Sequence, residues 1–185
     1  MAVSEPPPLN PTEPPEEIRR RLAWPDDKLR AECVVHTHRT GGPGGQHRNK
    51  TESAVRLHHR PSGLIVTGEE RRSQHQNAAN ALHRLRESIA TYFRAPLPAA
   101  LAWPPSVRIH AGRLKVSPEN PGYFEVVGLA LDALVALRGV PQDAARYLGV
   151  STTSYVRFLA GEPRIWQEAN RLRREFGLIP LKANA

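Results

Sequence analysis

The sequence predicts an α+β fold, in which a short β-sheet with one packed helix precedes a C-terminal unit made only of helices. Three short segments, rich in β-branched residues or alternating between apolar and polar side chains, supply the sheet. One long segment with apolar residues three or four positions apart supplies the packed helix. Further segments of helical spacing, separated by glycine and proline stops, fill the second half of the chain.

The N-terminal residues 1–24 are expected to be disordered and proline-rich. Residues 1–15 hold six prolines and almost no large apolar side chains. A proline ligand for a partner module is the alternative. The composition of residues 16–22 is compatible with a short helix, and a second helix start follows at Pro25, where two acidic residues come first.

The first strand is expected over Cys33–His38, because of its β-branched content. His36 and His38 are two positions apart and share one face of this strand. No third ligand at a suitable spacing accompanies them, so no metal site is expected.

A glycine-rich loop follows the first strand. Residues 41–45 are four glycines and one proline, which cannot form a stable helix or a central strand. Such a segment gives up side chains so that its backbone can approach a partner closely. Gln46 and a cationic run come directly after it. We therefore expect a loop that carries backbone donors to its partner.

A hairpin and the long helix complete this part of the chain. Residues 54–59 alternate as a half-buried strand does, Pro61-Ser62-Gly63 is a turn signal, and residues 64–67 form the return strand. Arg56 and His58 are expected on the face opposite Val55 and Leu57. The helix is predicted from Ser73, a good N-cap, to about Tyr92. Its buried stripe is expected to be Ala78, Leu82, Leu85 and Ile89.

The second half of the chain divides into a linker and a helical domain. Residues 95–122 contain six prolines, which predicts a stiff linker with a short strand at residues 107–109. A helical domain follows over residues 123–185. Its helices are predicted over residues 126–137, 142–148, 152–159 and 163–176. The inward side chains of the last helix are expected to be Trp166, Ala169, Leu172 and Phe176.

Residues 144–151 have the spacing of a helix-turn-helix, with small residues between the helices, glycine at the turn and serine as a cap. Three interpretations remain open. DNA recognition is the first, although Arg157 is the only basic residue of the second helix. A compact bundle that reuses this turn is the second, and we favour it. A ribosome- or RNA-docking surface is the third, with its cations at Arg171, Arg173 and Arg174.

Charge and cysteine content limit the class of protein. The chain has 26 Lys and Arg against 18 Asp and Glu, a net charge of +8. Residues 36–94 hold ten of the cations and four of the acids, together with seven of the eight histidines. This favours a polyanionic partner such as nucleic acid, with a solvated basic face as the alternative. Cys33 is the only cysteine, so disulfides are excluded and a reducing compartment is expected. No run of 18 apolar residues exists, so we expect a cytoplasmic protein that spans no membrane.

Three blocks that follow the glycine loop identify a family. The first is Gly44-Gly45-Gln46-His47 with Asn49-Lys50-Thr51 and Ser53-Ala54-Val55-Arg56. The others are Pro61-Ser62-Gly63-Leu64-Ile65-Val66 and Glu70-Arg71-Arg72-Ser73-Gln74-His75-Gln76-Asn77. In these blocks the chain resembles the catalytic GGQ domain of class I peptide chain release factors and of their ribosome-rescue relatives. The resemblance covers roughly residues 25–92. Arg48 departs from it, because the family usually has a small apolar residue there.

This resemblance implies a GGQ catalytic domain over residues 25–94, with Gly44, Gly45 and Gln46 as its catalytic residues. The implied reaction is hydrolysis of the ester that joins the nascent peptide to tRNA, in the peptidyl-transferase centre of the large ribosomal subunit. The glycines let the backbone enter a crowded RNA site, and the Gln46 N–H donates to the developing oxyanion or to the leaving hydroxyl. A preorganised donor of this kind contributes a rate factor of about 10²–10³. The Gln46 amide cannot act as a general base at neutral pH.

The expected partners are the ribosome, through its large-subunit rRNA, and peptidyl-tRNA. RNA contacts are expected from Arg39, His47, Arg48, Asn49, Lys50, Arg71 and Arg72. A methyltransferase that modifies the Gln46 amide is a further possible partner, and no cofactor is expected. We expect a monomer.

Only about 25 residues precede the GGQ domain, whereas stop-codon readers carry a large decoding domain there, so we expect codon-independent release of the ribosome-rescue kind. Two alternatives are a nucleic-acid-binding regulator that uses the helix-turn-helix-like unit, and a hydrolase of free peptidyl-tRNA. The latter needs a protein active site. No nucleophile–base pair stands out, and the proximity of Ser53 to His58 or His59 in the sequence is a weak signal.

Overall fold

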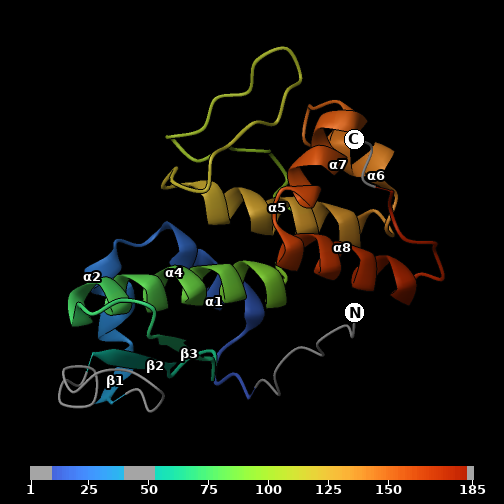
Figure 1. The fold of residues 1–185 in the computed structure, drawn as a ribbon. Helices are drawn as coiled ribbons and strands as arrows, with labels where there is room; N and C mark the ends of the chain where they lie inside the picture. The colour runs from blue at the N-terminus through green and yellow to red at the C-terminus, as the bar shows by residue number, and fades with distance from the viewer. Residues whose placement is uncertain (1–9, 40–52, 183–185) are drawn as a thin grey trace. The chain divides into compact units, whose positions relative to one another are not determined.

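The computed structural model of the protein describes residues 10–39 and 53–182. These residues form two compact units, and the boundary between the units falls after Ile89. The first unit is α+β and the second is helical, as predicted (Figure 1). Among the described residues, no helix combines the length and the apolar character needed to cross a membrane.

The first unit consists of short N-terminal helices, a three-stranded sheet and one long helix. In chain order its elements are α1 (Pro15–Arg20), the 3₁₀-helix η1 (Arg21–Ala23), α2 (Asp26–Ala31), β1 (Cys33–His38), β2 (Ala54–His59), β3 (Ile65–Gly68) and α4 (Gln74–Tyr92), whose end extends past the unit boundary. The sheet is antiparallel in the order β1-β2-β3. The two predicted strands 33–38 and 54–59 are confirmed residue by residue, and the return strand lies one position later than predicted.

One face of the sheet forms the core with α4. Val55 and Leu57 are buried, while Arg56 on the other face of β2 is exposed. The predicted stripe of α4 is confirmed, because Ala78, Leu82, Leu85 and Ile89 are all buried. The apolar residues that alternate along β2 and those at helical spacing along α4 therefore form one apolar layer.

The N-terminal segment is more ordered than its proline content suggested. Helical structure covers residues 15–23, and it buries Ile18 and Leu22 completely or nearly so. Apolar burial overrides the proline signal here, because Pro15 stands at the first helical position, where its missing N–H costs nothing. The short helix expected over residues 16–22 is present, whereas disorder through residue 24 is not seen in the described part.

The second unit contains four helices at the predicted places: α5 (Tyr123–Ala136), α6 (Pro141–Tyr147), α7 (Thr152–Ala160) and α8 (Pro163–Glu175). Ser151 caps α7 by accepting a hydrogen bond from the Ser154 N–H, at 3.2 Å. The hydroxyl of the buried Tyr155 donates to the Ala130 carbonyl of α5, at 2.8 Å. These contacts fix α7 within the bundle.

The proline-rich segment 95–122 forms no helix or strand but belongs to the second unit. Val107 and Leu114 are buried in it. The predicted strand at residues 107–109 is wrong. The Val107 N–H bonds to the Pro104 carbonyl at 2.8 Å, so the chain turns at this point rather than extending.

One expectation for α8 is also wrong, and one of the open interpretations loses support. Phe176 lies just after the last helical residue and is 36% exposed, so it is not an inward side chain. Two of the three cations of the docking interpretation, Arg171 and Arg173, are engaged in contacts within the helical unit. Arg171 pairs with Glu168 at 2.7 Å and with Glu175, and the buried Arg173 donates to the carbonyls of Gly139 and Ile179. Of the three cations, Arg174 alone keeps the predicted exposure.

Candidate functional site

The glycine-rich loop connects two neighbouring strands. β1 and β2 are antiparallel partners, and His38, the last residue of β1, pairs with Ala54, the first of β2. The chain from Thr40 to Glu52 therefore leaves and re-enters the sheet at adjacent positions. The predicted site residues of this loop lie outside the described residues: Gly44, Gly45, Gln46, His47, Arg48, Asn49 and Lys50.

A buried asparagine holds the exit of the loop. Asn77 on α4 is completely buried. Its Nδ2 donates to the carbonyl of Ser53 at 2.7 Å and to that of Arg71 at 2.8 Å, while its Oδ1 accepts from the Arg71 N–H at 2.9 Å. An amide side chain is suited to this joint because it donates and accepts at once. Asn77 thus ties the residue after the loop to the bend before α4.

Gly68 lets this bend lie close to α4. It is the last residue of β3, and a Cβ built there would lie 2.1 Å from the Asn77 carbonyl oxygen. Any side chain at this position would push β3 away from α4. This displacement would also disturb the hydrogen bonds of Asn77.

We expect Gly68→Ala to destabilise the unit by about 3 kcal/mol or more, at the upper end of the cost of overpacking, because the obstacle is backbone. Urea unfolding followed by circular dichroism measures this. Gly177→Ala is the control, since nothing lies within 4 Å of its Cβ position and its φ is +70°. Equal losses from the two substitutions would contradict the close-approach argument.

The carboxylate of Glu70 braces the same bend. It pairs with Arg84 of α4 at 2.5 Å and accepts from Asn80 at 3.2 Å, and Arg84 also donates to the Thr67 carbonyl. Partial burial opposes ionisation, but hydrogen bonds from its own backbone amide, Arg84 and Asn80 lower the pKa of Glu70 to about 2. Glu70 is therefore anionic at neutral pH, and its charge is directed to Arg84.

Three of the predicted RNA contacts are described, and all three are exposed at the base of the loop. Arg39 follows the last residue of β1, while Arg71 and Arg72 form the bend that Asn77 and Glu70 hold. The end of β3 lies beside the start of β2, where Gly68 pairs with Val55. All three cations thus lie at the sheet end from which the loop emerges, which is the arrangement expected for phosphate contacts.

Residues 27–98 match the RF-1 domain, which is the GGQ domain of class I release factors. The matched segment belongs to the RF-1 domain family. Peptide chain release factor 1 of Caldicellulosiruptor bescii is 49% identical over 61 residues, 33% of this chain and 17% of that protein. The Gluconobacter oxydans factor 1 is 48% identical over 77 residues, 42% of this chain and 21% of its own length. Peptide chain release factor 2 of Petrotoga mobilis is 53% identical over 65 residues, 35% of this chain and 16% of its own.

The RF-1 domain thus accounts for the sheet, the loop and α4. The chain spans about a fifth or less of the length of these relatives, and the four C-terminal helices lie beyond the matched segment. Nothing in the match covers the helix-turn-helix-like unit.

A buried chain of hydrogen bonds lies at the opposite end of the RF-1 domain sheet. Ser62 Oγ lies 2.7 Å from His59 Nδ1, and His59 Nε2 lies 3.0 Å from Glu32 Oε2. Burial lowers the pKa of His59 against the opposing pull of Glu32, so the imidazole is neutral at neutral pH. A neutral ring then donates from Nε2 to Glu32 and accepts the Ser62 hydroxyl at Nδ1.

This Ser–His–Glu arrangement looks like a catalytic triad but is structural. Ser62 and His59 are completely buried, and the Ser62 oxygen already accepts from the Leu64 N–H at 3.2 Å. A substrate carbonyl has no access to it. The serine that contacts a histidine in the structure is therefore Ser62, in the β2–β3 turn, and not Ser53. Its partner is His59, three residues earlier. Only the spacing His59-x-x-Ser62 hinted at this pair.

Proposed function

We propose that the protein hydrolyses the ester of peptidyl-tRNA in the peptidyl-transferase centre of the ribosome, with Gly44, Gly45 and Gln46 at the reacting bond. The match of residues 27–98 to the RF-1 domain carries this proposal, because the tripeptide lies within it. The loop that bears the tripeptide emerges between the paired ends of β1 and β2. A loop anchored at both ends can present its tip to a narrow site while α4 and the sheet stay outside.

The proposed chemistry needs no protein nucleophile. Water attacks the ester carbonyl carbon, the bond to the 3′-oxygen of tRNA breaks, and that oxygen takes up a proton as the peptide acid leaves. The backbone N–H of Gln46 donates to the oxygen on which negative charge develops, and its side chain admits water and excludes larger nucleophiles. This N–H stabilises the transition state only if it is already in position when negative charge develops on the oxygen. The placement of the backbone therefore matters more than the reactivity of a side chain.

The cations at the base of the loop serve to position it. We propose that Arg39, Arg71 and Arg72, together with His47, Arg48, Asn49 and Lys50 of the loop, contact ribosomal RNA. Phosphate contacts of this kind set orientation and carry no sequence information. The partners are then the large ribosomal subunit and peptidyl-tRNA, and a methyltransferase acting on the Gln46 amide is compatible with this site. A cytoplasmic monomer fits this function.

We further propose that the reaction does not require a stop codon. The matched segment corresponds to 16–21% of the release factors compared, so most of their length has no counterpart among the matched residues. Catalysis by the GGQ domain and codon reading by another part of a release factor can be separated. The match of residues 27–98 supports catalysis only.

Peptide release from purified ribosomes tests both proposals. Ribosomes that hold labelled peptidyl-tRNA are prepared with a stop codon, a sense codon or no codon in the A site. We expect release in all three cases, with rates within a factor of about three. Release confined to the stop codon would contradict codon independence but leave the hydrolase proposal standing. No release from any complex, with the protein bound, would contradict both.

A further inference from the structure

A basic surface forms in the helical unit where a small hairpin meets α7. The hairpin has a two-residue turn, Ala111-Gly112, with φ of 49° and 67°, closed by a bridge between His110 and Arg113. Positive φ at both central positions defines the tight turn that suits the twist of a hairpin. Arg113 and Lys115 lie in the extended segment that follows the turn.

The hairpin is fixed to the start of α7. The Gly112 carbonyl accepts from the Ser151 N–H at 2.8 Å, and the Leu114 N–H donates to Ser154 Oγ at 2.7 Å. Leu114 is buried, so its neighbours in an extended chain point the other way. Arg113 and Lys115 are accordingly exposed.

Arg157 extends this charge along the helix. It lies three residues after Ser154, which touches the hairpin, and residues three apart are neighbours on a helix surface. Arg113, Lys115 and Arg157 together are named the hairpin–α7 surface. Residues 106–116 and 151–161 contain no acidic side chain, so neither element neutralises these cations.

Some other cations of the unit are neutralised locally. Arg146 pairs with Asp143 at 2.8 Å, and Arg171 pairs with two glutamates, as described above. The three cations of the hairpin–α7 surface pair with no acidic side chain in the described part of the chain, and they gather on two elements that hydrogen bonds join.

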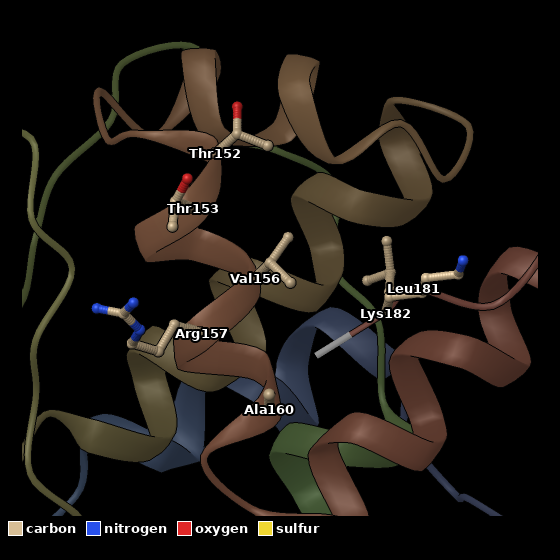
Figure 2. A pocket seen from close by; sticks show the side chains of 7 residues that line it. All are labelled: Thr152, Thr153, Val156, Arg157, Ala160, Leu181 and Lys182. Carbon is tan, nitrogen blue, oxygen red and sulfur yellow. The ribbon is translucent and has the colours of Figure 1, made fainter. Parts of the chain in front are cut away.

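A groove of about 150 Å³ borders the surface on the other side of α7. Thr152, Thr153, Val156, Arg157 and Ala160 line it from the helix, and Leu181 and Lys182 from the C-terminal segment. Figure 2 shows Val156 pointing toward Leu181 and Arg157 pointing away to the opposite side. A polymer that lies along the Arg157 side of α7 therefore meets the cations of the hairpin and of the helix.

We propose that the hairpin–α7 surface binds the phosphate backbone of double-helical RNA. Its cations are suited to phosphate oxygens. The exposed side of α7 offers threonines and one arginine, with no Asn or Gln that would read base edges. RNA helices are recognised mainly by shape and backbone. The choice of RNA over DNA rests on the proposed ribosomal function, whereas the affinity for phosphate rests on the surface itself.

Binding of the full-length protein to a labelled 20-base-pair RNA hairpin tests this. The triple variant Arg113→Gln, Lys115→Gln, Arg157→Gln should bind about tenfold more weakly or worse, the equivalent of at least one lost charged hydrogen bond. The slope of log affinity against log salt should fall by about two to three, since each lost phosphate contact removes slightly less than one unit. The matched control, Arg138→Gln, Arg146→Gln, Arg174→Gln, loses the same charge from exposed positions of the same unit.

The outcomes are distinct. Loss in the test variant with retention in the control supports the proposal, and the charge-conserving Arg113→Lys, Arg157→Lys variant should keep the affinity. Equal binding by test and control variants, both folded by circular dichroism, would overturn the proposal. Tighter binding of a DNA duplex of the same length would overturn the choice of RNA. Because binding is measured without ribosomes and release with them, failure here is separable from failure of the hydrolase proposal.

Discussion

Gly45→Ala should lower the rate of peptide release by about 10²–10³, the size of the effect of one preorganised donor. The reason is geometric. A methyl group on this residue changes the path of the backbone in a crowded RNA site and so displaces the N–H of Gln46. Gln46→Ala keeps that N–H and removes only the amide side chain. We therefore expect Gly45→Ala to impair release at least as strongly as Gln46→Ala. Single-turnover release from stalled ribosomes measures both.

Gly149→Ala is a control for the general cost of losing a glycine. Gly149 is in the helical unit with φ +65° and nothing within 4 Å of its Cβ position, so its replacement should cost about 1 kcal/mol of stability and leave release unchanged. Co-sedimentation with ribosomes separates chemistry from binding. A fully active Gly45→Ala protein would remove the basis for placing the backbone at the reacting bond.

Glu32→Ala should cost about 3 kcal/mol of stability in the first unit. The Glu32 carboxylate bonds the Arg21 guanidinium at 2.5 and 3.1 Å and also His59 at 3.0 Å. The side chain of Arg21 is only 7% exposed, so truncation of its main partner leaves a buried charge that Glu13, at 2.7 Å, compensates only in part. Desolvation disfavours the Glu32 carboxylate, but Arg21 and His59 more than offset it and lower its pKa.

Glu17→Ala is the matched control for this second prediction. Glu17 pairs with Arg20 at 2.7 Å, but both side chains are largely exposed, so the loss should stay below about 1 kcal/mol. Urea unfolding at neutral pH compares the two variants. A Glu32→Ala protein no less stable than Glu17→Ala would show that the buried ion pair adds nothing to the fold.

The elements of the fold could be predicted closely because each has a local cause. Ala54–His59 was recognisable because apolar and polar residues alternate from Val55 onward, and α4 because Ser73 caps its start and accepts from the Gln76 N–H at 3.4 Å. The predicted strand at residues 107–109 failed because β-branched content alone does not outweigh the turn at Pro104.

The candidate site was only partly predictable. Arg39, Arg71 and Arg72 are exposed at the loop base, and their predicted RNA contacts stay predictions. Nothing in the sequence singled out Asn77 as the residue that joins the loop exit to the bend of Arg71. Its bond to Ser53 spans 24 positions. Likewise Glu32 and His59 are 27 positions apart, and a pairing at that distance leaves no periodic trace.

Local patterns were enough to predict the α+β order, most strand and helix positions, and the tripeptide with its cationic flank, because periodicity, caps and motifs are properties of neighbouring residues. Which cations stay exposed to a partner depends instead on contacts that form only when the chain folds. In the sequence Arg171 and Arg173 looked available for docking, but in the structure they contact groups of the helical unit itself. Arg113 and Lys115 lie in a segment predicted as a linker, and they are exposed beside α7. The physical reason is that a charge is satisfied or exposed according to what folding places next to it, and those neighbours come from distant parts of the chain.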